Sequence, residues 1–144
     1  LHRGQIVMHK TLKEDVILLF RFMRNQRFPI ESAIPIRFDK PNDGTSMDTL
    51  NSSYSFHYRR ISTSGNGSRS VHSYGMAIDI NPYNNPAVLA NGKVIPQGGT
   101  YDRDIPGTLA DTSPVVKEFI RLGWTWGGNW TSLKDYMHFE KKLP

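Results

Sequence analysis

The feature that most limits how this chain can fold is the absence of cysteine from its 144 residues. Disulfide scaffolds, thiol nucleophiles and cysteine-type zinc fingers are therefore excluded. The length is usual for a single domain, and a hydrophobic fraction of 38% with 12 glycines is ordinary for a globular protein. We expect one domain over residues 1–144 with one hydrophobic core.

The net charge of +5, from 18 basic and 13 acidic residues, gives a pI near 9.6. A basic surface suits nucleic acid, anionic lipid and anionic cell-wall polymer equally well. The arginines between positions 21 and 27 are more simply a solvated helix face, and we expect no nucleic-acid partner. The longest apolar run, Val16 to Phe20, is far shorter than the roughly 18 residues of a membrane span. The chain opens without an initiator methionine or a signal segment, and we expect a mature or excised domain.

Two amphipathic segments predict helices. Apolar residues recur at helical spacing after Thr11, whose Thr-x-x-Glu sequence has the form of a capping box, and Pro29 would end this helix. A second helix is predicted over residues 114–122, with Ser113 as its N-cap and Gly123 just past its end.

Other segments predict short strands. Asn91-Gly92, between two apolar runs, is typical of a β-hairpin over residues 87–95. Residues 77–80 and 136–140 alternate as half-buried strands do. Together these elements predict an α+β fold, with a small, largely antiparallel sheet flanked by helices.

His72 and Asp79 form the first half of a candidate metal site. Seven positions along a helix span roughly 10 Å, too far for two ligands of one metal, and in a straight strand the two side chains would face opposite sides. The two can meet only if the chain reverses between them, and Gly75 suits such a turn because it tolerates a positive φ.

The third ligand would be His138, since Met137 and Phe139 occupy the apolar face of the predicted strand. Two histidines and one carboxylate form a catalytic zinc set that leaves a fourth position for water. Asp135 would sit at the entrance of this strand. The alternative is that Asp79 begins an Asx-type turn and the histidines only pack. Spacing alone leaves both possibilities open.

Three segments, taken together, resemble a known family. Ser70-x-His72-x-x-Gly75-x-Ala77-x-Asp79 matches in full the Ser-x-His-x-x-Gly-x-Ala-x-Asp signature of the VanY-type zinc D-Ala-D-Ala carboxypeptidases and L-alanyl-D-glutamate endopeptidases. Residues 51–59 resemble that family's arginine-bearing segment, and residues 123–130 with 135–140 resemble its second zinc-binding segment. The likeness covers most of residues 4–142, with the motifs in the family's order.

The resemblance implies one Zn²⁺ per chain, held on the sheet by His72, Asp79 and His138. Zinc lowers the pKa of its water toward about 7, which would give the nucleophile without a covalent intermediate. The implied substrate is the stem peptide of bacterial peptidoglycan or its precursor, cut next to a D-residue.

Other residues match the family's catalytic positions. Asp135 matches the acid/base, and Glu140, on the strand face of His138, is the next candidate for the base. Arg59 matches the arginine that steadies the oxyanion, although a shift of one residue would put Arg60 there. Ser70 matches a position near the substrate, the alternative being a hydroxyl that only orients the loop.

The run Asp79-Ile80-Asn81-Pro82-x-x-Asn85-Pro86 looks like family members labelled D-Ala-D-Ala carboxypeptidase, which is the activity we expect. The alternatives are an L-alanyl-D-glutamate endopeptidase, either a wall enzyme or a phage lysin, and a non-catalytic zinc-bearing wall-binding module. A pure binding module would need neither an acid/base nor an oxyanion arginine. The expected location is extracytoplasmic (cell wall, cell envelope or secreted), or that of a released phage lysin.

Overall fold

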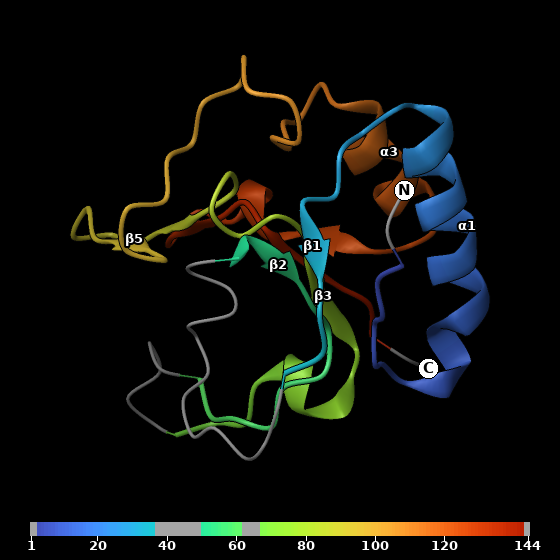
Figure 1. The fold of residues 1–144 in the computed structure, drawn as a ribbon. Coiled ribbons are helices and arrows are strands. Elements are labelled where there is room, and N and C mark those ends of the chain that lie inside the picture. Colours follow the sequence, from blue (N-terminus) through green and yellow to red (C-terminus); the bar gives the residue numbers. More distant parts are fainter. Residues whose placement is uncertain (1–2, 37–49, 62–66, 143–144) are drawn as a thin grey trace.

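The structure is a computed structural model that describes residues 3–36, 50–61 and 67–142 (Figure 1). Its helices are α1 (Lys13–Asn25) and α3 (Pro114–Arg121), with short 3-10 turns η1 (Lys10–Leu12), η2 (Val71–Tyr74) and η3 (Gly127–Asn129). Its strands are β1 (Ser32–Ala33), β2 (Ser52–Ser53), β3 (Ala77–Asp79), β4 (Ala87–Val88), β5 (Val94–Ile95), β6 (Thr125–Trp126), β7 (Lys134–Asp135) and β8 (His138–Glu140). Within the described part of the chain, no helix has the length and apolar character needed to cross a bilayer.

A three-stranded antiparallel sheet, in the order β3-β8-β6, lies at the centre of the fold. In the β3–β8 pair, Ile78 lies opposite Phe139 and Asp79 lies opposite His138. Cross-strand partners share one face of a sheet, and successive residues alternate between faces. Ile78 and Phe139 are fully buried in the hydrophobic core, so Asp79 and His138 are carried together on the other face.

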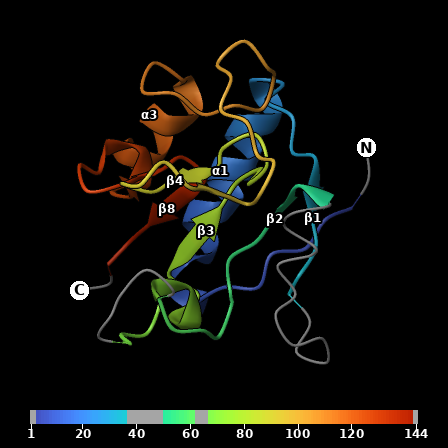
Figure 2. The same ribbon diagram turned by 90° about the vertical axis from the view of Figure 1, so that its left-hand side faces the viewer.

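Both helices pack on the core face of this sheet, α1 beside α3 (Figures 1 and 2). Phe119 of α3 stacks on Phe139 with ring centroids 3.8 Å apart and meets Trp124 edge to face at 5.6 Å. Leu19 and Met23 of α1, both 1% exposed, complete this part of the core. The helices therefore pack against the core face of β8 and hold this strand in place.

The α+β class is confirmed, but the prediction of one sheet is wrong. A second antiparallel sheet has the order β5-β4-β7, and β1 pairs with β2 in parallel. The hairpin predicted over residues 87–95 is present as β4 and β5. Asp135 lies in β7, opposite Ala87 of β4, and so belongs to a different sheet from His138. The two intervening residues, 136 and 137, carry the chain from one sheet to the other.

The predicted helices are present, but the capping box predicted for the first helix is not. Thr11 lies inside η1 rather than at the start of α1, and its backbone N–H donates to the His9 ring at 3.4 Å. The capping-box prediction is therefore wrong, because a 3-10 turn precedes the helix. Ser113 is the N-cap residue of α3 and Gly123 follows its end, as predicted, although the Ser113 hydroxyl makes no capping hydrogen bond to the residues that the structure describes.

Two buried asparagines tie the turn after β3 to neighbouring loops. The Asn81 amide donates to the carbonyl oxygens of Pro29 at 2.8 Å and Gly107 at 3.2 Å. The Asn85 amide donates to Gly107 at 3.0 Å and accepts from the Leu109 N–H at 2.6 Å. Buried amides with satisfied donors and acceptors fix loop positions, so both asparagines have a structural explanation here.

The packing of Phe119 generates the first prediction. Phe119→Ala removes a side chain that is 0% exposed and stacked against β8, so we expect the free energy of unfolding to fall by about 3–5 kcal/mol. Ile120→Ala, at a neighbouring position that is 47% exposed, is the matched control. Urea denaturation of both variants measures the difference, and equal losses would contradict the placement of Phe119 in the core.

Candidate metal centre

The chain reversal between His72 and Asp79 is present as predicted. His72 lies in η2, where its backbone N–H donates to the Ser70 hydroxyl at 3.3 Å. Gly75 ends the turn at φ +63°, in the left-handed region. A Cβ on Gly75 would lie 2.6 Å from the backbone nitrogen of His9, so both the conformation and the space require glycine.

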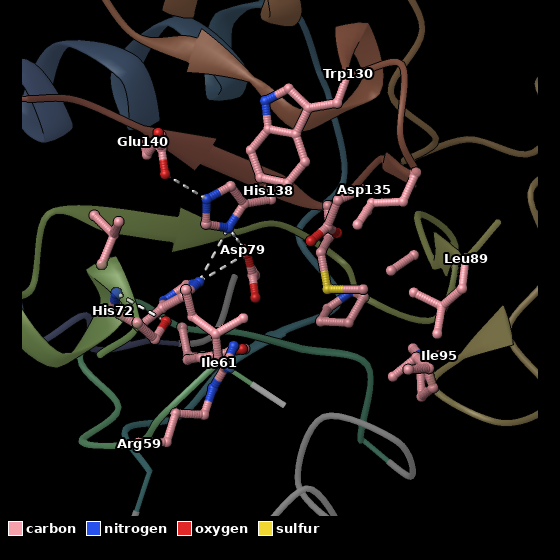
Figure 3. Close-up of a pocket in the computed structure, with 18 residues that line it drawn as sticks. Arg59, Ile61, His72, Asp79, Leu89, Ile95, Trp130, Asp135, His138 and Glu140 are labelled. Atoms are coloured by element: carbon pink, nitrogen blue, oxygen red, sulfur yellow. Dashed lines mark hydrogen bonds and ion pairs between the residues drawn. The ribbon is translucent and has the colours of Figure 1, made fainter. Parts of the chain in front are cut away.

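The side chains of His72, Asp79 and His138 converge on one point (Figure 3). Asp79 Oδ1 lies 3.2 Å from His72 Nε2 and 3.0 Å from His138 Nδ1, and the two nitrogens are 3.1 Å apart. All three residues are buried. The Asx-type turn is therefore wrong for Asp79, whose carboxylate meets both histidines.

This donor set fits a metal ion. The ligand atoms of the three residues all lie within 4.8 Å of one another, so each could reach one ion at the roughly 2.0–2.2 Å of zinc–nitrogen and zinc–oxygen bonds. Two imidazoles and one carboxylate are a usual catalytic zinc set. A cluster of this kind on buried side chains is unusual without a ligand to share them.

Charge is paired inside this cluster. Burial works to raise the pKa of Asp79, but the two histidines hold it well below its usual value. Burial works to lower the pKa of His138, but hydrogen bonds to Asp79 and Glu140 raise it to about 10. The metal-free cluster is thus an ion pair, and a metal ion would replace the proton on His138.

Contacts outside the cluster orient the His72 ring. Its Nδ1 lies 2.6 Å from the Ser55 carbonyl oxygen, which accepts the ring proton and leaves Nε2 free toward Asp79. The Tyr54 ring stacks on His72 with centroids 5.0 Å apart, and Tyr54 exchanges backbone hydrogen bonds with Asp79 at 3.1 and 2.8 Å.

Sequence reasoning missed both of these contacts. Tyr54 lies in the segment that resembles the family's arginine-bearing segment, five residues before Arg59. This proximity is the sequence feature that could have indicated Tyr54 as a site residue. Ser55 contributes a backbone carbonyl oxygen. Every residue type has one, so no sequence pattern could have indicated this contact.

Asp135 approaches the same cavity from β7. Its Oδ1 is buried and has no hydrogen-bond partner among the described residues. Burial, followed by repulsion from Asp79, raises the pKa of Asp135 to about 7. An unpartnered carboxyl group that titrates near neutral pH can accept and release a proton there.

Arg59 also lines this cavity (Figure 3), whereas Arg60 does not. Burial works to lower the pKa of Arg59, but Tyr54 and Asp79 raise it, so the guanidinium stays charged. The exposed Arg60 instead donates to the Gly67 carbonyl oxygen. Ser70 lines the cavity as well, with its hydroxyl engaged by the N–H of His72.

The cavity has a volume of about 230 Å³ and two chemically different ends. The histidines and Glu140 lie at one end, and the apolar side chains of Leu89 and Ile95 lie at the other (Figure 3). The Trp130 ring lies beside the His138 ring, with their centroids 5.2 Å apart. The cavity therefore has the Asp135 carboxyl group, the Arg59 guanidinium and the cluster of His72, Asp79 and His138 beside an apolar wall.

Comparisons with known proteins cover the same region. A family model described as D-alanyl-D-alanine carboxypeptidase matches residues 63–141. Over 80 residues the chain is 36% identical to the peptidoglycan L-alanyl-D-glutamate endopeptidase CwlK of Bacillus subtilis (strain 168), a match that covers 56% of this chain and 44% of the relative. The match thus spans less than half the length of that relative. No solved structure matches the chain.

The raised pKa of Asp135 predicts a pH-dependent stability in the metal-free protein. The unfolded carboxyl loses its proton near pH 3.8, but the folded one keeps it up to about pH 7. The stability that this group contributes is therefore present at low pH and is lost as the pH rises toward 7. Asp135→Asn, which cannot ionise, should be more stable than the wild type at pH 8 by on the order of 2 to 4 kcal/mol, and of similar stability at pH 4.

Urea denaturation of chelator-treated protein at both pH values tests this expectation. The control is Asp104→Asn, because Asp104 is exposed. A stability difference for Asp135→Asn that does not change with pH would contradict the burial of an unpartnered carboxylate.

Proposed function

The chain belongs to the D-alanyl-D-alanine carboxypeptidase family of metallopeptidases, and from that membership we propose that it is a zinc peptidase that cleaves stem peptides of bacterial peptidoglycan. One observation carries the proposal: an acid/base candidate, Asp135, opens into the same cavity as the cluster of His72, Asp79 and His138. A site that only stored a metal would need no buried carboxyl group beside it.

The proposed zinc ligands are His72 through Nε2, Asp79 through Oδ1 and His138 through Nδ1. When bound, zinc acts as a Lewis acid and lowers the pKa of a coordinated water toward about 7, so that a nucleophile is available at neutral pH. Three protein ligands leave a coordination position open for this purpose.

Two residues of the chain would act on the reacting groups, one by transferring the proton of the attacking water and one by stabilising the negative charge on the carbonyl oxygen. Asp135 would accept the proton of the attacking water on Oδ1 and pass it to the nitrogen of the leaving amine as the peptide bond breaks. Arg59 would donate hydrogen bonds to the carbonyl oxygen as negative charge develops there. Tyr54 supports this, because its contact with Arg59 links the guanidinium to Asp79.

The cavity and the charge of the chain support a stem-peptide substrate. The apolar end, with Leu89 and Ile95, would accept the methyl groups of alanine residues. The net charge of +5 suits an anionic wall polymer. Because this substrate lies outside the cytoplasm, we propose an extracytoplasmic location or release as a phage lysin.

We propose D-Ala-D-Ala carboxypeptidase as the activity, which the description of the matching family supports. The second candidate is an L-alanyl-D-glutamate endopeptidase, which the curated relative in Bacillus subtilis supports. Both reactions use the same zinc, acid/base and arginine, and differ in which bond of the stem peptide lies over the metal.

Muropeptides that end in D-Ala-D-Ala distinguish the two activities. Mass spectrometry of the products should show the loss of one alanine if the chain is a carboxypeptidase. Separation of the stem after its first residue would identify an endopeptidase instead. A zinc-loaded protein that yields neither product would refute the peptidase and favour a wall-binding module.

Zinc content separates the proposed ligands from the proposed acid/base. Wild-type protein should hold about one zinc per chain. Asp135→Asn should keep zinc but lose turnover by on the order of 10² to 10⁴, because an amide cannot accept the water proton. His138→Ala should lose the metal and the activity together.

Elemental analysis beside a peptidase assay measures both quantities. If Asp135→Asn empties the site, then Asp135 is a ligand. If the wild type is zinc-free and fully active in chelator, the metal site itself is wrong.

A further inference from the structure

Among the described residues that line the cavity, Glu140 is the carboxylate that contacts the His138 ring nitrogen facing away from Asp79. It is two residues after His138 in β8, so both side chains project from the same face of the strand. Its Oε2 lies 3.3 Å from His138 Nε2, and its side chain is 21% exposed. Figure 3 shows Glu140 on the opposite side of the His138 ring from Asp79.

The geometry does not make Glu140 a fourth ligand. The ligand atoms within 4.8 Å of one another belong to His72, Asp79 and His138. The Glu140 carboxylate faces the imidazole nitrogen that points away from this group. Asp135, with its unpartnered oxygen, is the better placed acid/base, so Glu140 has a contact but no assigned chemistry.

The contact determines which nitrogen of His138 can bind a metal. A neutral imidazole carries its proton on one nitrogen and a lone pair on the other. His138 Nδ1 is the atom that faces Asp79 and His72, so a metal-binding ring must carry its proton on Nε2. A carboxylate that accepts this proton favours the required tautomer, fixes the ring orientation and makes Nδ1 a stronger ligand.

The two histidines are oriented in opposite senses. His72 donates from Nδ1 to the Ser55 carbonyl oxygen at 2.6 Å and presents Nε2, whereas His138 donates from Nε2 and presents Nδ1. The partner of His72 is a backbone atom, which no substitution can remove. The partner of His138 is a side chain and can be changed.

We propose that Glu140 is a positioning residue that holds the His138 ring with Nδ1 directed at the metal and thereby raises the affinity of the site for zinc. The proposal rests on the proposed zinc site but not on the identity of the cleaved bond. It also gives a function to a carboxylate that lines the cavity but is already engaged by the His138 ring.

Zinc affinity, measured by competition with a chromophoric chelator, tests the proposal without a substrate. Glu140→Ala should weaken zinc binding about 10- to 100-fold. Glu140→Gln should restore most of the affinity, because its amide oxygen can still accept the Nε2 proton. Glu14→Ala, at an exposed position of α1, is the control and should bind zinc as the wild type does.

A spectroscopic readout separates positioning from a general loss of structure. In zinc-loaded protein, the Nε2 proton of His138 should give a slowly exchanging NMR signal in the wild type and in Glu140→Gln. The signal should exchange rapidly in Glu140→Ala. Circular dichroism of each metal-free variant checks that the fold is intact.

Each outcome decides the question. If Glu140→Ala binds zinc within twofold of the wild type, or if Glu140→Gln is as weak as Glu140→Ala, the positioning role is overturned. If the wild type binds zinc but cleaves no muropeptide, the proposed function fails while the affinities still decide the role of Glu140. If the wild type binds no zinc, the positioning proposal falls with the metal site.

Discussion

The pairing of Asp79 with His138 across β3 and β8 is the interaction on which the site depends. It places two proposed ligands directly opposite each other, on the face of the sheet that the helices do not cover. A slip of β8 by one residue in this pair would turn His138 into the core and bring Phe139 to the cavity. The core contact between Phe139 and Phe119 opposes that slip, so the hydrophobic core and the cluster of His72, Asp79 and His138 favour the same register from opposite faces of the sheet.

The surroundings of the cluster are arranged at a cost in stability. In the part of the chain that the structure describes, one buried carboxyl oxygen of Asp135 has no partner, and an unsatisfied buried polar group costs on the order of 1–3 kcal/mol. By contrast, the amides of Asn81 and Asn85, on the turn that follows Asp79, are well bonded. The backbone beside the site is thus held firmly, while the group proposed to move a proton is left unsatisfied.

Much of this arrangement could be predicted from the sequence, because the local patterns were strong. The spacing of His72 and Asp79 required a reversal, and the left-handed Gly75 makes it. The hairpin at Asn91-Gly92 followed from turn chemistry that does not depend on distant contacts. The structure also brings His72, Asp79 and His138 together, as the sequence predicted. Their role as zinc ligands stays a prediction.

Features that depend on tertiary contacts could not be predicted in the same way. The separation of Asp135 and His138 into two sheets depends on β4, which pairs with β7 from nearly 50 residues away. The Ser55 carbonyl oxygen acts through its backbone, and the failure of the Thr11 capping box reflects a 3-10 turn that the pattern did not indicate. Hydrophobic periodicity indicates where strands occur, but it does not indicate which strands pair in the same sheet.

The sequence distance between the clustered side chains has a consequence for a chain that lacks cysteine. His72 and His138 are 66 residues apart, and Asp79 and His138 are 59 apart. An ion held by all three would close long loops, as a disulfide does in an oxidised protein, and closing loops of this length restricts the unfolded chain strongly. Unlike a disulfide, this cross-link would depend on the free metal concentration, since binding to the folded state alone adds stability that grows with the logarithm of that concentration. The resistance of the molecule to unfolding would therefore follow the zinc supply of its surroundings rather than their redox state.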